Sequence, residues 1–170
     1  MQYPAQKHLA SAILSLQAAA DIPQRYFSRR QKKEGLHLIV VTHAFGFSKS
    51  GVQDFDETIA ERLKREGVTF VTGTHALSGM ERAISRRLGG ASRTEAIAEA
   101  FRRIVSVGTK VAVECVLIAA DCGAVPTDRE VIAVGGTEEG ADTVLVIRPS
   151  HTASFFDLQI REFAAMPRDR

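Results

Sequence analysis

Residues 36–74 carry the pattern that most constrains the fold of this chain. LHLIVVTH, at 36–43, is a continuous apolar run rich in β-branched residues, which is typical of a strand buried on both faces. A pattern with helical periodicity follows at 55–67, and VTFVTGT, at 68–74, predicts a second strand. Strand, helix and strand joined by short connections form a βαβ unit, in which the two strands run parallel. The segments that follow the two strands therefore meet at one edge of the sheet.

Three helices are predicted after the second strand. The first spans 79–88 and the second 93–107, each with its apolar residues turned toward the sheet. These inward residues are Met80, Ala83, Ile84 and Leu88 in the first helix, and Ile97, Ala100, Phe101 and Ile104 in the second. TKVAVECVLIAADCG, at 109–123, suits either a buried strand or a buried helix, and its length, its alanines and Gly123 favour a helix.

Two further strands are predicted near the end of the chain. EVIAVGGT, at 130–137, and ADTVLVIRP, at 141–149, are separated by a loop short enough for an antiparallel hairpin. The 45% hydrophobic content of the 170 residues is sufficient for one domain with a sizeable core. The predicted fold class is therefore α/β with a mixed, mostly parallel sheet.

Charge and hydropathy exclude several classes of partner. The formal net charge of +2 is close to balance, so a nucleic-acid partner is not expected. No apolar run reaches the roughly 18 residues that a membrane helix needs. The N-terminus also lacks a secretory signal with a clear cleavage site. We therefore expect a cytoplasmic protein with no membrane partner.

Two predicted helix starts, at Ser78 and Ser92, are candidate anion sites. A glutamate follows each serine by three residues, which matches the capping-box pattern. A helix start presents N–H groups to an anion, and Gly79 would let a ligand approach the backbone closely. Arg82 and Arg93 supply positive charge nearby. Ordinary surface helices carry similar caps and arginines, so a purely structural role stays open.

Polar residues follow the two strands of the βαβ unit, at the edge where open α/β sheets bind ligands. Thr42 and His43 follow the first strand, and His75 follows the second. Either histidine could contact a ligand, transfer a proton or bind a metal. Glu114 and Asp121 could supply a carboxylate, but internal hydrogen bonds would explain them as well. No further ligand stands out, and no metal site is predicted.

Gly135, Gly136 and Thr137 end the next predicted strand at the same edge. Without Cβ atoms the two glycines allow backbone N–H groups to approach a phosphate, and Thr137 can add a hydroxyl donor. A tight hairpin turn would explain the same residues equally well. The sequence contains no G-x-S-x-G elbow, P-loop or G-x-G-x-x-G fingerprint, so covalent catalysis is not predicted.

Several blocks of the sequence resemble one known family. They are VVTHAFGF, HALSGMERAISRRLGGASRTEAIAEAFR, KVAVECVLIAADCGAVP and EVIAVGGTEEGADTVLVIRPSH, followed by the FFD and MPR segments. Over about residues 36–168 the chain is similar to a small stand-alone family related to the C-terminal α/β domain of pyruvate kinase. The resemblance implies a three-layer α/β/α fold with a five-stranded mixed sheet whose last strand is antiparallel.

The same resemblance implies ligand binding without kinase activity. Pyruvate kinase keeps its active site in a different domain and uses this one to bind a phosphorylated effector, and the stand-alone family is associated with flavin mononucleotide (FMN). We therefore expect FMN or another phosphorylated small molecule as the ligand. The residues expected around it are Thr42, His43, Gly46, Ser78, Gly79, Arg82, Arg93, Thr94, Gly135, Gly136 and Thr137. The alternatives are an enzyme that uses His43 or His75 as acid or base, and a regulatory or interaction domain with a vestigial pocket.

Residues 1–35 depart from the family pattern. Family members usually open with a strand and a Ser/Thr-Gly-rich loop, whereas this segment has no glycine before Gly35 and is predicted to be mainly helical. LASAILSL is too rich in alanine and leucine to predict a strand. Either the N-terminus is truncated or altered, which leaves the sheet without its usual first strand, or the ligand binds without that loop. A sheet edge exposed in this way would need cover from the N-terminal segment or from a second copy in a homo-oligomer.

Overall fold

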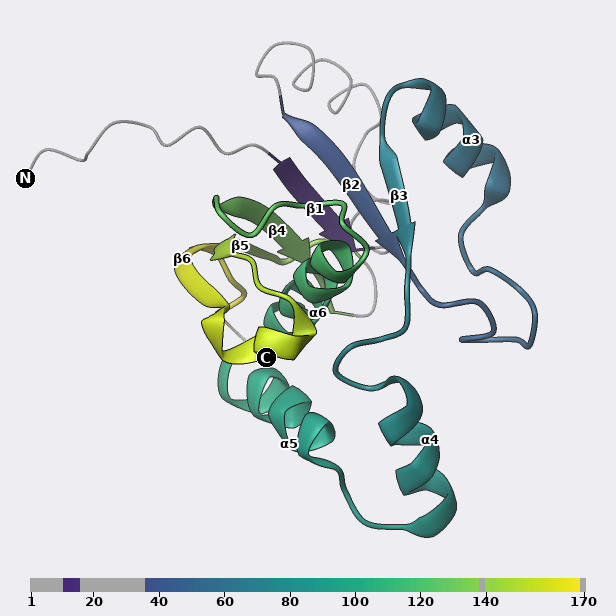
Figure 1. The fold of residues 1–170 in the computed structure, drawn as a ribbon, viewed down its shortest axis with the longest axis vertical. Helices are drawn as coiled ribbons and strands as arrows, with labels where there is room; N and C mark the ends of the chain where they lie inside the picture. The colour runs from purple at the N-terminus through teal and green to yellow at the C-terminus, as the bar shows by residue number, and fades with distance from the viewer. Residues whose placement is uncertain (1–10, 16–35, 138–139, 169–170) are drawn as a thin grey trace, which may run out of the picture.

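The structure is a computed structural model that describes residues 11–15, 36–137 and 140–168. These described residues form a six-stranded sheet in the order β3-β2-β1-β4-β5-β6 (Figure 1). The strands β1 to β4 run parallel to one another, whereas β5 is antiparallel to β4 and to β6. The strands are β1 Ser11–Ser15, β2 His37–Thr42, β3 Thr69–Thr72, β4 Val131–Gly135, β5 Thr143–Arg148 and β6 Gln159–Ala165.

The described helices cover the sheet unequally. They are α3 Glu57–Arg65, α4 Gly79–Leu88, α5 Arg93–Ala100 and α6 Val107–Asp121, with a π-helical turn at Phe101–Val105 and a 3₁₀ segment at Thr152–Asp157. In Figure 1, α4 and α5 lie beyond one end of the sheet, and α6 lies against its middle. The helix predicted for 109–123 is confirmed as α6, which begins and ends two residues earlier than predicted.

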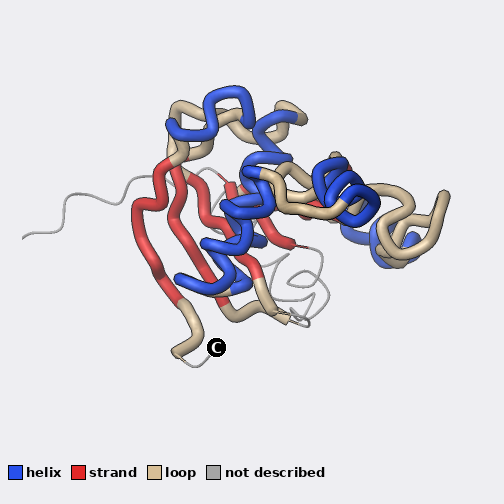
Figure 2. The backbone as a smooth tube through the Cα atoms, turned by 90° about the horizontal axis from the view of Figure 1, so that it is seen from below, coloured by secondary structure: helices blue, strands red, loops and turns tan. Residues whose placement is uncertain are grey.

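Two apolar clusters on opposite faces of the sheet produce a three-layer arrangement. On one face α6 packs against Ile13, Ile39 and Leu145, which are completely buried. Figure 2 shows this long helix crossing the strands. On the other face Leu63 of α3 packs with Val40 and its neighbours. The α/β class and the mixed, mostly parallel sheet between helical layers are thus confirmed.

The helical prediction is wrong at 11–15, and so is the alternative in which the sheet lacks its first strand, because β1 lies in the middle of the sheet between β2 and β4. Ile13 is buried on the α6 face, and Ala12 and Leu14 are buried on the α3 face. This is the alternation of a strand with both faces covered. Burial at the sheet centre therefore outweighs the weak strand propensity of alanine and leucine. The rest of the predicted helical segment, 1–10 and 16–35, lies outside the described residues.

The last strand, β6, is not predicted by the sequence pattern. Its segment QIREFAA is exposed at most positions, so it lacks the apolar alternation that reveals a half-buried strand. It pairs with β5 through an irregular register. The described sheet therefore contains six strands rather than about five.

The predicted orientation of α4 is also wrong. Met80, Ile84 and Leu88 are 72%, 44% and 79% exposed, and no residue of the helix is buried. The more protected side of α4 carries Arg82 and Ser85 instead. Polar contacts on that side therefore determine the rotation of α4 about its own axis, and the apolar side faces solvent.

The predicted helix 93–107 is interrupted before its end. α5 gives way to the π-helical turn, and Ser106 then caps α6 by accepting a hydrogen bond from the Thr109 N–H at 3.0 Å. Ile97 and Phe101 pack against the core as predicted. The change in helical period turns Ile104 outward, where it is 72% exposed, and Ala100 is exposed as well.

Candidate functional site

Three aromatic rings meet at the carboxyl edge of β2 and β3. The ring centroids of His43 and His75 lie 5.4 Å apart. The Phe47 ring lies 4.1 Å from His43 and 4.9 Å from His75. The two histidines follow neighbouring parallel strands, which explains why the βαβ pattern brings them together.

Asp54 orients His43 from the loop between β2 and α3. His43 Nδ1 lies 2.8 Å from Asp54 Oδ2, and Ser48 Oγ donates to the same oxygen at 3.0 Å. The hydrogen bond with His43 lowers the pKa of Asp54, so this carboxylate is ionised at neutral pH. An imidazole oriented by an ionised carboxylate is suited to proton transfer.

Glu114, buried in α6, connects the second histidine to the backbone and to a cation. Its Oε1 accepts a hydrogen bond from the Leu77 N–H at 2.8 Å. Its Oε2 lies 3.3 Å from His75 Nδ1 and also accepts a hydrogen bond from Lys110 Nζ. Burial opposes ionisation of Glu114, but the hydrogen bonds with His75 and Lys110 outweigh it, and the pKa falls from 4.5 to about 2.

Three cations line a cavity of about 150 Å³ beside these groups. They are Arg82 of α4, Arg102 of the π-helical turn and Lys110 of α6. Glu114 is the one carboxylate among the described residues that line it. Burial lowers the pKa of Lys110, although attraction to Glu114 opposes that change. Lys110 is paired with Glu114 inside the cavity, and Arg102 is paired at 2.6 Å with Glu99, which does not line it. The lining itself therefore keeps an excess of positive charge, which suits an anion.

His75 adds a polar atom that lacks a partner. Its Nε2 is buried and has no hydrogen-bond partner among the described residues. Buried polar atoms are normally paired, so a ligand that reaches this nitrogen would gain a hydrogen bond. The cavity volume of about 150 Å³ suits a phosphate-sized group. It is smaller than the roughly 300–1,000 Å³ of sites that enclose a whole drug-sized ligand.

The structure brings together only part of the predicted site. The predicted residues that line the cavity are Thr42, His43, His75, Ser78 and Arg82. Those that do not line it are Gly46, Gly79, Arg93, Thr94, Gly135, Gly136 and Thr137. The helix starts also differ from each other, because the predicted capping box is confirmed at Ser92 but Ser78 makes no capping hydrogen bond. The Ser78 hydroxyl instead lies 3.5 Å from Glu114 Oε1.

Gly135, the last residue of β4, and Gly136, which follows it, both lie close to other parts of the backbone. A Cβ on Gly135 would collide with the Gly108 carbonyl oxygen of α6, and one on Gly136 would collide with the Gly140 carbonyl oxygen. The Thr137 N–H donates to Asp142 Oδ2 at 2.9 Å. These residues therefore have a packing role in closing the hairpin and seating α6.

The sequence patterns do not predict three residues that line the cavity, namely Phe47, Arg102 and Lys110. For Glu114 they predict either a possible metal ligand or an internal hydrogen-bond acceptor. One signal was present, because Lys110 and Glu114 stand four residues apart in a helix that is otherwise almost entirely apolar. Charged residues are rarely buried unless they are paired, so this spacing indicates an internal ion pair.

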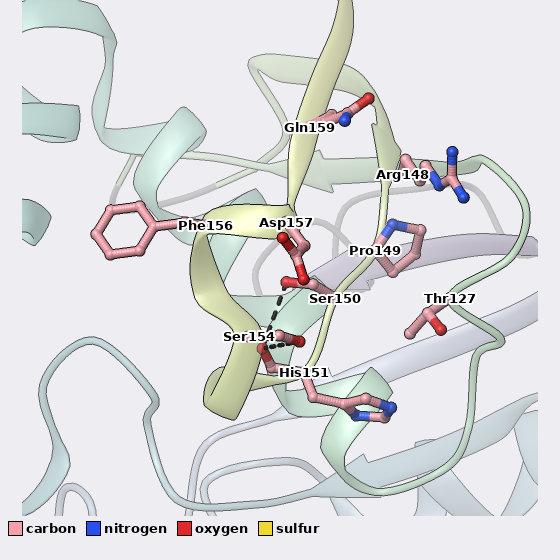
Figure 3. Close-up of a pocket in the computed structure, with 9 residues that line it drawn as sticks. All are labelled: Thr127, Arg148, Pro149, Ser150, His151, Ser154, Phe156, Asp157 and Gln159. Atoms are coloured by element: carbon pink, nitrogen blue, oxygen red, sulfur yellow. Dashed lines mark hydrogen bonds between the residues drawn. The ribbon is translucent and has the colours of Figure 1, made fainter.

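A second and more open cavity, of about 430 Å³, lies where β5 leads into the 3₁₀ segment (Figure 3). Its polar side chains bond mainly to nearby groups. The Ser150 and Ser154 hydroxyls donate to the His151 carbonyl oxygen, and His151 Nδ1 lies 3.3 Å from Asp121. Phe156 points away from the other lining residues in Figure 3. This cavity lacks the concentration of cations found in the first.

No protein-family model matches the chain. Within the described ranges, no group of three or more His, Cys, Asp or Glu residues is arranged to hold a metal ion. The described helices are all too short or too polar to cross a membrane.

Proposed function

We propose that this chain is a binding domain for a phosphorylated small molecule, with FMN as the first candidate and without kinase activity. The observation that supports the proposal is the cationic cavity formed by Arg82, Arg102 and Lys110. A phosphate is small, carries up to two negative charges and accepts several hydrogen bonds, so it matches both the volume and the charge of this cavity. Because His75 Nδ1 faces the Glu114 carboxylate, Nε2 would donate to the phosphate when the ring is protonated and would accept from a protonated phosphate oxygen when it is neutral.

FMN is preferred because the resemblance to the stand-alone family implies it. The cavity has room for the phosphate but not for the three-ring flavin, which would lie outside. Phe47 is 48% exposed and stands beside both histidines, so it offers an aromatic surface for the ring system. This arrangement predicts that most of the selectivity for FMN over riboflavin comes from the phosphate.

Equilibrium titration with FMN, riboflavin and fructose 1,6-bisphosphate tests the proposal. We expect FMN to bind more tightly than riboflavin, and Arg82→Ala to weaken FMN binding by about tenfold to a hundredfold, because a charge-assisted hydrogen bond is lost. Arg65→Ala is the matched control, since Arg65 is exposed on α3 and lies away from the cavity. Equal affinities for FMN and riboflavin, or unchanged FMN binding by Arg82→Ala, would contradict a phosphate-anchored site.

The pairing of His43 with Asp54 supports a second candidate function, namely an enzyme that acts on a small metabolite with His43 as acid or base. His43→Ala would then abolish turnover while leaving ligand affinity within about threefold. Steady-state kinetics and equilibrium titration of the same variant separate the two functions. Parallel loss of affinity and turnover would instead make His43 a binding residue.

A further inference from the structure

The α4 helix presents its apolar face to solvent. Met80, Ile84 and Leu88 are 72%, 44% and 79% exposed. They stand four residues apart, so they form one stripe along the helix. Ala83, beside this stripe, is exposed as well. Three large apolar side chains aligned on one short helix form a continuous patch rather than scattered surface residues.

Contacts on the opposite side of α4 hold the helix in this orientation. Arg82 points into the cationic cavity, and the Ser85 hydroxyl donates to the Glu95 carboxylate of α5. Rotating the apolar stripe inward would remove both polar groups from these positions. In Figure 1 the helix lies beside α5, at the periphery of the molecule. The apolar face is therefore available for a partner without rearrangement of the site.

We propose that this face binds the same face of a second copy of the chain, with the two α4 helices antiparallel. The stripe is symmetric about Ile84, so an antiparallel pair places Ile84 against its counterpart and Met80 against Leu88 of the other copy. A two-fold axis requires a self-complementary surface of this kind.

The charges at the two ends of α4 favour the antiparallel arrangement. The first turn carries Glu81, and the last turn carries Arg86 and Arg87. Antiparallel pairing brings the acidic end of each helix alongside the basic end of the other. Parallel pairing would instead place the two Arg87 residues, which lie beside the stripe, at the same end of the pair, which is unfavourable. Because a single short helix buries less area than a standard interface, the dimer is expected to be weak and concentration-dependent.

Sedimentation equilibrium over a range of protein concentrations tests the proposal. We expect a reversible monomer–dimer equilibrium, with Leu88→Ser raising the dissociation constant by about tenfold or more because a buried leucine is lost from the interface. Phe156→Ser is the matched control, since Phe156 is 90% exposed on the 3₁₀ segment and lies outside α4. A protein that stays monomeric at all concentrations, or one for which the two variants weaken association equally, would overturn the proposal.

Cysteine cross-linking tests the antiparallel geometry, starting from Cys122→Ser to remove the exposed native thiol. Ile84→Cys is expected to form a disulfide-linked dimer on mild oxidation, because residue 84 faces itself. Leu88→Cys is expected to cross-link poorly alone and efficiently when mixed with Met80→Cys. Efficient self-linking of Leu88→Cys but not of Ile84→Cys would exclude this pairing.

Discussion

Replacing Glu114 with alanine is expected to destabilise the protein by about 3–5 kcal/mol, as is usual when one partner of a buried ion pair is removed. Lys110 is 3% exposed and would be left inside the protein without its charged partner. The Leu77 N–H would also lose its acceptor. Urea denaturation followed by circular dichroism measures the loss as a lower unfolding midpoint.

The double variant Lys110→Met with Glu114→Gln, compared with Glu114→Gln alone, separates charge burial from loss of packing. Glutamine retains an oxygen for the Leu77 N–H in both, and methionine removes the buried cation while filling similar space. We expect the double variant to be more stable than Glu114→Gln alone. If the two were equally unstable, the buried charge would not be the cause.

The pH dependence of stability provides an independent check on the same group. In the folded protein the pKa of Glu114 is about 2, below its ordinary value of 4.5. A depressed pKa in the folded state means that the unfolded chain binds protons more readily in this range. The stabilisation from Glu114 is therefore complete above about pH 4.5 and is lost as the pH falls through 2. The Glu114→Gln double variant should lack this component of the acid transition.

The sequence predicts those parts of the fold whose local pattern agrees with their final environment. The run 36–43 is apolar because β2 is covered on both faces, and the residues of α6 are apolar because that helix is buried almost throughout. β1 is different, since five residues of ordinary composition become a central strand through pairing with β2 and β4. Such pairing depends on partners far along the chain, which local propensity does not record.

The candidate site shows the same division between local and long-range information. The histidines are predictable because each follows a strand of one βαβ unit. The cavity also needs Arg102 and Lys110, which reach it only through the break between α5 and α6 and the packing of α6 on the sheet. The rotation of α4 is set by contacts of Arg82 and Ser85 with other elements. Its apolar pattern alone therefore predicts the wrong side.

Gly135→Ala is expected to destabilise the protein by more than about 3 kcal/mol, at the upper end of the cost of overpacking. The added Cβ would collide with the Gly108 carbonyl oxygen and lie 2.9 Å from the Ala112 nitrogen, and neither backbone atom can move without shifting α6. Gly73→Ala is the graded comparison, because there the new Cβ would lie 2.8 Å from a side-chain methyl group of Ile118 rather than from backbone. We therefore expect a smaller loss for Gly73→Ala in urea denaturation.

The same variant distinguishes the two roles considered for the glycine loop. If Gly135 serves the packing of β4 on α6, its substitution lowers stability, and any folded protein that remains binds FMN with wild-type affinity. If the loop instead approaches a ligand phosphate, Gly135→Ala keeps its unfolding midpoint but loses affinity. The collision with backbone of α6 favours the first outcome, because that helix occupies the space into which a ligand would have to reach.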